Sequence, residues 1–329
     1  MKKPLVILTG PTAVGKTEFS INLAKAIGGE IVSADSMQVY RGMDIGSAKI
    51  KPQEMCGVTH HLIDVLDPDE EFHVVRFQKM ARQAMEEVYA RKKIPILVGG
   101  TGFYIQAVLY DVDFAADGGD RAYREELRRQ GQVKGAEYLH EKLALVDPEY
   151  AAQVHANNQK KVIRALEFFH STGQKLSEHN VEQAGKDSPY NFAYFVLNDE
   201  RARVYGRIDR RVEQMVEEGL VAEVRGLKEK GYTRELVSMQ GLGYKEILDY
   251  LDGRTSLSEA VEIIKRDTRH FAKRQITWFK RERDTCWLDK DKFGHDEARM
   301  LEAALDVLRE RGIVGIKRIG TKREEDDGI

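Results

Sequence analysis

The sequence predicts an α/β fold, with a parallel sheet flanked by helices and a second, all-helical segment inserted into it. Short apolar runs alternate with runs of helical spacing over the first 110 residues and again from residue 190. Between these parts the chain is highly charged, has a helical pattern and contains no good strand. We therefore expect a discontinuous core of residues 1–110 and 190–316, a helical insertion of residues 111–189 and a charged tail of residues 317–329.

The first strand, residues 4–8, leads directly into a loop that fits the pattern G-x-x-x-x-G-K-[ST] in full, and a helix follows over residues 17–27. A strand, a glycine-bearing loop and a helix N-terminus together form an anion cradle of main-chain N–H groups, to which Lys16 adds a full charge. The Thr17 hydroxyl can ligate Mg²⁺. The pattern predicts a P-loop NTPase-like core with a polyphosphate site formed by Gly10, Pro11, Thr12, Ala13, Val14, Gly15, Lys16 and Thr17.

The remaining elements follow the same alternation. Further strands are expected over residues 30–34, 94–98 and 192–197, with a short one at 285–288 and a helix over 73–93. His60 and His61 are adjacent, so in a strand they point to opposite faces, which favours packing or positioning over a shared metal.

Composition limits the possible classes of protein. The chain has 329 residues, 42% of them hydrophobic, and a net charge of −2, so it is not a general polyanion binder. Two cysteines form neither a disulfide framework nor a zinc cluster. We expect no signal peptide, because the first strand already starts at residue 4, and no apolar run in the sequence approaches the length of a membrane span. We expect a cytoplasmic monomer without a membrane partner.

One segment departs from this average charge. Residues 265–283 contain eight Lys or Arg and two Asp or Glu, and their spacing gives a basic stripe and an apolar stripe on one helix. Such a helix can pack on the protein with one face and meet phosphates with the other, although a solvated surface helix has the same pattern.

Two side chains outside the loop are candidates for chemistry. Asp35 follows the second strand, where a carboxylate enters the crevice at the strand ends and either binds Mg²⁺ through water or accepts a proton. Arg207 lies in a basic helical stretch after the insertion and can clamp a leaving phosphate. The third strand ends in Gly99-Gly100-Thr101 instead of an acidic residue, which argues against a hydrolysing NTPase but not against a small-molecule kinase.

The motifs, taken in order, resemble those of the bacterial tRNA dimethylallyltransferases, also called tRNA isopentenyltransferases. After the P-loop come residues 35–49 (DSMQVYRGMDIGSAK), 60–64 (HHLID), 99–101 (GGT), 241–246 (GLGYKE) and 272–279 (AKRQITWF). The resemblance covers residues 4 to about 290. One departure is Ser47, at a position where threonine is common in the family.

This resemblance implies a reaction and assigns roles. The family transfers a dimethylallyl group from dimethylallyl diphosphate to N6 of the adenosine immediately 3′ of the anticodon in tRNA, releasing diphosphate. The P-loop then holds the diphosphate leaving group with Mg²⁺. Asp35 resembles the general base, and Thr12 and Arg207 resemble the groups that stabilise the leaving group.

The family also implies which residues meet the RNA. The target base has to leave its stack to reach the pocket, and the insertion is expected to grip the anticodon stem-loop. The implied tRNA contacts are Asp35, Ser36, Met37, Gln38, Thr101, Arg124, Gln159, Lys160, Lys161, Val162, Ile163, Gly243, Tyr244, Lys245, Arg274 and Gln275.

Three alternatives stay open on the sequence. A small-molecule P-loop kinase would share the loop, and an adenylate isopentenyltransferase would prenylate free nucleotide. A non-catalytic RNA-binding module would explain the basic helix but would leave the P-loop and Asp35 without a role. The helical insertion and the basic helix favour tRNA over a free nucleotide.

Overall fold

The computed structural model describes residues 2–114 and 121–315 of the chain. The predicted tail of residues 317–329, and residues 115–120 of the predicted insertion, lie outside the described residues. The chain divides into two compact units, Met1–Ile105 with Tyr190–Ile329 and Gln106–Pro189.

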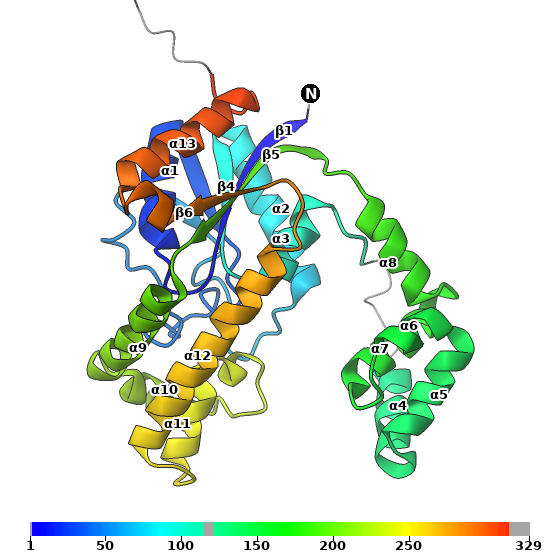
Figure 1. Cartoon of the computed structure of the whole chain (residues 1–329). Coiled ribbons are helices and arrows are strands. Elements are labelled where there is room, and N and C mark those ends of the chain that lie inside the picture. The colour runs from blue at the N-terminus through cyan, green and yellow to red at the C-terminus, as the bar shows by residue number, and fades with distance from the viewer. Residues whose placement is uncertain (1, 115–120, 316–329) are drawn as a thin grey trace, which may run out of the picture. The chain divides into compact units, whose positions relative to one another are not determined.

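Within the described residues, the first unit is built on a six-stranded sheet in which all pairs are parallel, in the order β3-β2-β4-β1-β5-β6 (Figure 1). Strand β1 is one of the two central strands, and its Ile7 pairs with Leu97 on one side and Tyr194 on the other. The strands are β1 (Lys3–Thr9), β2 (Gly29–Ser33), β3 (His60–His61), β4 (Ile94–Val98), β5 (Tyr190–Asn198) and β6 (Thr285–Asp289). The predicted parallel α/β fold is therefore confirmed.

Helices cover both faces of this sheet. Leu5, Val6, Ile7 and Leu8 are all fully buried, as expected for a central strand with helices on either side. In Figure 1, α1 (Lys16–Ile27) and α13 (Glu297–Glu310) lie against one face of the sheet, and α2 (Val74–Ala90) and α3 (Gly102–Leu109) lie against the other.

Further helices extend beyond the carboxyl ends of the strands, where the site is found (Figure 1). They are α9 (Arg201–Glu217), α10 (Leu220–Glu229), α11 (Tyr244–Leu251) and α12 (Leu257–Phe279), with short 3₁₀ turns at η1 (Ser238–Gln240) and η2 (Lys290–Phe293). Ala13 of the P-loop packs into a small cluster with Val204 and Ile208 of α9 and Ala272 of α12. These two helices therefore meet the loop directly.

The second unit is helical. Its elements are α4 (Arg121–Lys134), α5 (Ala136–Val146), α6 (Pro148–Gln153), α7 (Gln159–Thr172) and α8 (Leu176–Gly185). They enclose a core of their own around Leu127, Leu139, Leu143 and Leu166. Asp147 caps α6 and also accepts the Ser177 hydroxyl at 2.7 Å, which joins α6 to α8. No helix in the described parts of the chain is long and apolar enough to cross a membrane.

Candidate active site

The P-loop is held by unusual backbone angles and by a close approach to β5. Gly10, Ala13 and Gly15 have φ of 148°, 61° and 96°. A Cβ on Gly10 would lie well inside 3.0 Å of the Leu197 carbonyl, so only glycine fits there. The left-handed Ala13 is a strained position of the kind that gathers at functional sites.

Lys16 folds back over this loop. Its Nζ donates to the carbonyl oxygens of Gly10 and Pro11 at 3.0 and 2.9 Å. Burial lowers the pKa of Lys16 to about 8, while the nearby Asp35 carboxylate acts in the opposite direction and Arg211 lowers it further. Within the described part of the chain, its hydrogen-bond partners are carbonyl oxygens, and a desolvated ammonium of this kind gains strongly from an anion placed beside it.

Asp35 lies at the carboxyl end of β2 and faces the same cavity as the P-loop. Its Oδ1 accepts the main-chain N–H groups of Met37 and Gln38 at 2.8 and 3.3 Å, which fixes the carboxylate in a turn. Among the described residues, its Oδ2 accepts no hydrogen bond. A cavity of about 60 Å³ is lined by Asp35 together with Lys16 and Thr17. The predicted base and the predicted anion site thus meet in one place.

Arg207 reaches the loop from α9. Its Nε donates to the carbonyl oxygen of Ala13 at 2.8 Å, and its Nη2 donates to Asp199 Oδ2 at 2.6 Å. Asp199, directly after β5, is completely shielded from solvent, and its Oδ1 accepts the N–H of Glu200. The guanidinium is therefore anchored beside the strained loop residue by a buried carboxylate.

The structure also brings the motif around residues 241–246 next to the Asp35 segment. A Cβ on Gly241 would lie well inside 3.0 Å of the Met37 side chain. Glu223 of α10 accepts the N–H groups of Asp44 and Ile45 at 2.9 and 2.7 Å, and the Tyr244 hydroxyl at 2.8 Å. This carboxylate ties the loop after Asp35 to α10 and α11.

Several predicted RNA contacts are placed differently from the expectation. The side chains of Val162 and Tyr244 are fully buried, and that of Gln275 is 6% exposed. Val162 packs in the core of the second unit and Tyr244 against Gly46, so their side chains serve packing and cannot face an RNA in this structure. The Gln275 amide forms its hydrogen bonds with main-chain groups of Thr12 and Gly100.

The other predicted contacts are accessible to different degrees. Exposed side chains are those of Lys160, Lys161 and Arg274, and partly exposed ones are those of Asp35, Ser36, Met37, Gln38, Thr101, Gln159 and Lys245. Ile163 and Gly243 are buried in their own units. Accessible polar and basic groups thus occur in both units.

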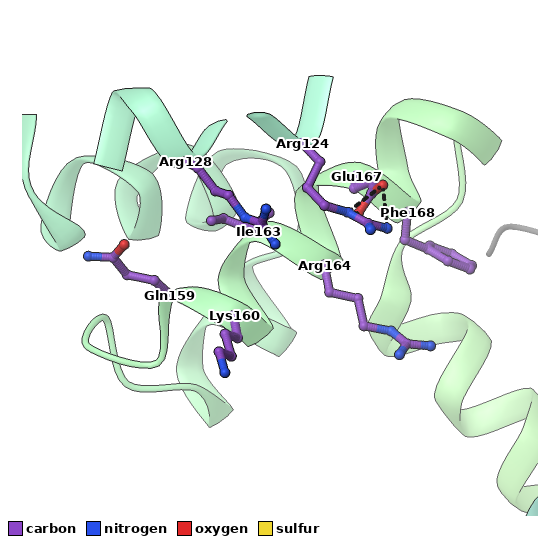
Figure 2. A pocket seen from close by; sticks show the side chains of 8 residues that line it. All are labelled: Arg124, Arg128, Gln159, Lys160, Ile163, Arg164, Glu167 and Phe168. Carbon is purple, nitrogen blue, oxygen red and sulfur yellow. Dashed lines mark hydrogen bonds and ion pairs between the residues drawn. The ribbon is translucent and has the colours of Figure 1, made fainter. Parts of the chain in front are cut away.

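A basic pocket lies in the second unit (Figure 2). It has a volume of about 420 Å³ and is formed by α4 and α7. Its acidic lining residue, Glu167, is buried and is paired with Arg124 at 2.8 Å. The lining residues are Arg124, Arg128, Gln159, Lys160, Ile163, Arg164, Glu167 and Phe168, so cations outnumber carboxylates and the pocket suits a polyanion.

A second basic groove runs along α12 in the first unit. It has a volume of about 370 Å³ and is lined by His270, Lys273, Arg274, Thr277, Trp278 and Arg281. Part of the predicted basic stripe is neutralised, because Arg266 pairs with Asp267 and Arg269 with Asp209. The cationic surface is thus concentrated in the second half of the helix.

Two residues near the loop were missed by sequence reasoning. Asp199 follows the strand over residues 192–197 just as Asp35 follows the second strand, so the same strand-end argument would have found it. Lys290 follows β6, and its Nζ would lie 2.9 Å from a Cβ placed on Gly15. It pairs with Glu297 at 3.3 Å, and no local pattern marks it.

A P-loop, a strand-end carboxylate over it and an anchored arginine beside it are typical of a P-loop α/β protein, a class in which such a loop binds anions. Comparison with known proteins narrows this class. A family model described as IPP transferase matches residues 38–282, and the chain belongs to this family.

The relatives are similar over nearly their whole length. A protein of Lachnoclostridium phytofermentans named tRNA dimethylallyltransferase is 58% identical over 95% of this chain and 99% of its own. One of the same name from Geobacillus thermodenitrificans is 50% identical over 88% of this chain and 91% of its own.

Solved structures of tRNA prenyltransferases are also similar to this chain. The full-length tRNA isopentenylpyrophosphate transferase of Bacillus halodurans has a TM-score of 0.71 at 44% identity, covering 95% of this chain and 99% of that one. A eukaryotic dimethylallyltransferase acting on tRNA has a TM-score of 0.83 at 29% identity, covering 96% and 81%. These findings support a prenyl-transferring enzyme over the kinase, free-nucleotide and non-catalytic alternatives.

Proposed function

We infer that this enzyme transfers a dimethylallyl group from dimethylallyl diphosphate to N6 of the adenosine immediately 3′ of the anticodon in tRNA, with release of diphosphate. The observation that carries this proposal is the cavity that Asp35 shares with Lys16 and Thr17, because the base and the leaving-group site must both reach the reacting atoms. The relatives are named tRNA dimethylallyltransferase, and these names suggest tRNA as the acceptor and dimethylallyl as the transferred group.

In the proposed step, N6 attacks C1 of the dimethylallyl group. The C1–O bond to diphosphate breaks as the N6–C1 bond forms, and the N6 proton passes to a carboxylate oxygen of Asp35. An exocyclic amine is a poor nucleophile because its lone pair is delocalised into the ring, so a positioned base helps. Since Oδ1 is held by two main-chain N–H groups, Oδ2 is the oxygen that takes the proton.

The charge that develops on the leaving diphosphate is met by groups already in place. Lys16 lies over the loop, and Arg207 is anchored beside it by Asp199. Because these groups do not need to reorganise, they stabilise the transition state more effectively than water would. The N–H of Thr12 is engaged by Gln275, so Thr12 would act on the leaving group through its hydroxyl.

The donor set fits Mg²⁺ held mainly through substrate. The described residues contain no group of three or more His, Cys, Asp or Glu side chains that could hold a metal by themselves. Mg²⁺ commonly keeps several waters and binds through one or two protein oxygens plus substrate phosphates. Thr17 would hold it with diphosphate, and when bound it supplies positive charge to the leaving group.

The tRNA would meet the two basic surfaces. We propose that the pocket of Figure 2 binds the phosphates of the anticodon stem, with Lys160 and Lys161 exposed at the start of α7. The α12 groove would bind the loop, where a flipped base can enter the site. We further propose that the chain works as a cytoplasmic monomer.

A direct test offers the enzyme ¹⁴C-labelled dimethylallyl diphosphate and Mg²⁺ with either an anticodon stem-loop RNA or AMP. The proposal predicts label in the RNA, lost when the adenosine 3′ of the anticodon is replaced by guanosine, which lacks the N6 amine. Label in AMP with none in RNA would contradict it, and so would transfer of the γ-phosphate of ATP in place of the prenyl group.

A further inference from the structure

Gln275 of α12 makes two hydrogen bonds that join distant parts of the active site. Its Oε1 accepts the main-chain N–H of Thr12 in the P-loop at 2.8 Å, and its Nε2 donates to the carbonyl oxygen of Gly100 after β4 at 2.9 Å. The side chain is 6% exposed. Both ends of the amide are therefore used within the protein, where a buried hydrogen bond is costly to lose.

The segment after β4 is shaped to receive α12. A Cβ on Gly100 would lie well inside 3.0 Å of Gln275 Nε2, and a Cβ on Gly102 equally close to the ring of Trp278. Neither glycine has a positive φ, so their backbones would accept another residue. Space for α12, and not backbone conformation, accounts for glycine at these two positions.

The helix that carries Gln275 also carries the basic groove. Arg274 is adjacent in sequence and exposed, and Lys273 and Trp278 line the groove with it. Gln275 instead faces the P-loop, as its bond to Thr12 shows. Helix α12 thus presents cations to solvent on one side, and on the other side the buried amide of Gln275 contacts the P-loop.

We propose that Gln275 is a positioning residue of the P-loop and not an RNA contact. It holds Thr12 and Gly100 at fixed distances from α12, and so sets the P-loop in register with the groove along that helix. This inference rests on the proposed function, because it names the residue that aligns the two substrate sites. Misplacement of a reacting group by about 1 Å can cost about 100-fold in rate.

The test compares Gln275→Met, which keeps the side-chain length but loses both hydrogen bonds, with Gly100→Ala, which leaves Gln275 in the chain but fills the space of its amide. Gly226→Ala is the matched control, because no atom lies within 4 Å of a Cβ at that helical glycine and its φ is not positive. Each variant is measured for thermal unfolding, affinity for inorganic diphosphate with Mg²⁺, Kd for an anticodon stem-loop RNA, and kcat and KM for dimethylallyl diphosphate.

We expect both Gln275→Met and Gly100→Ala to weaken diphosphate binding and to lower kcat by about 10- to 100-fold per folded enzyme, with the Kd for RNA unchanged. A raised Kd for RNA with normal diphosphate binding would show a direct RNA contact and overturn the proposal. Loss of thermal stability alone, with normal kcat and diphosphate affinity, would reduce Gln275 to packing and overturn it as well.

Failure of the positioning role of Gln275 can be distinguished from failure of the proposed prenyl transfer. If the unaltered enzyme fails to prenylate RNA, the proposed function is wrong, yet the diphosphate affinities still decide the role of Gln275. If the unaltered enzyme prenylates RNA and both variants match it, the proposed function stands and the positioning role is wrong.

Discussion

Replacing Asp199 by alanine should slow catalysis although its carboxylate is shielded from solvent and acts through Arg207. Asp199 Oδ2 accepts Arg207 Nη2 at 2.6 Å, and its carboxylate is completely shielded while the arginine side chain is 32% exposed. Without this partner, Arg207 keeps its bond to the Ala13 carbonyl but loses the contact that sets its orientation. The guanidinium then has alternative positions away from the leaving diphosphate.

The contacts of Asp199 set the expected loss of stability and the expected loss of rate. Truncation leaves the N–H of Glu200 without its acceptor and Arg207 partly compensated by water, so the free energy of unfolding should fall by about 1–3 kcal/mol. Removal of a donor to a developing anion commonly costs about 10²–10³ in kcat, and a displaced donor should cost about 10²-fold.

The assay is single-turnover transfer of labelled dimethylallyl to saturating anticodon stem-loop RNA, corrected for folded enzyme by calorimetry. Asp252→Ala is the control, because it removes an ion pair of the same length, 2.6 Å to Lys228, that does not involve Arg207. It should keep the normal rate. Asp199→Ala and Arg207→Ala should not be additive, since both act on one guanidinium.

One outcome would contradict this role of Asp199. If Asp199→Ala lost stability but transferred at the normal rate, while Arg207→Ala was slow, Arg207 would be positioned by other contacts, and Asp199 would have only a structural role.

Three further predictions follow from the site. Asp35→Ala should lower kcat by roughly 10²–10⁴-fold while Kd values for both substrates stay nearly constant; a variant with more than about a tenth of the normal rate would argue against a general base. The double variant Lys160→Ala, Lys161→Ala should weaken RNA binding and reduce the salt slope of log K by up to about 2, with diphosphate affinity unchanged in titrations across KCl concentrations. Because burial lowers the pKa of Lys16 to about 8, its positive charge is present below that pH and lost above it. Affinity for inorganic diphosphate, measured by calorimetric titration, should therefore fall from pH 7 to 9.5, and more steeply in the unaltered enzyme than in Lys16→Ala.

The lowered pKa of Lys16 also affects the stability of the fold. Its contribution to the free energy of unfolding rises with pH, whereas the affinity for diphosphate falls. The unfolded chain keeps the Lys16 proton up to the ordinary value of 10.5, whereas the folded chain loses it at about 8. Between these two values the unfolded state binds more protons, so this group makes folding more favourable as pH rises. Activity and stability should therefore diverge above pH 8.

Features of this protein that depend on local conformation could be predicted from the sequence alone. The P-loop was predictable because Gly10 and Gly15 adopt angles that other residues avoid, and because the loop joins an apolar strand to a helix start. Strands β1, β2, β4 and β5 were predictable because strands that are buried on both faces of a parallel sheet are continuous apolar runs. Asp35 was predictable as a strand-end carboxylate.

The distant side chains that contact this loop could not be predicted from the sequence and are seen only in the folded chain. Gln275 is 263 residues from Thr12, and Arg207 is 194 residues from Ala13, so no local pattern links them. Tyr244 lies in a motif that suggested an RNA contact, but packing against Gly46 buries it. Local sequence specifies backbone angles and apolar periodicity, whereas the partner of a polar side chain depends on how whole elements pack, which is settled only when the chain folds.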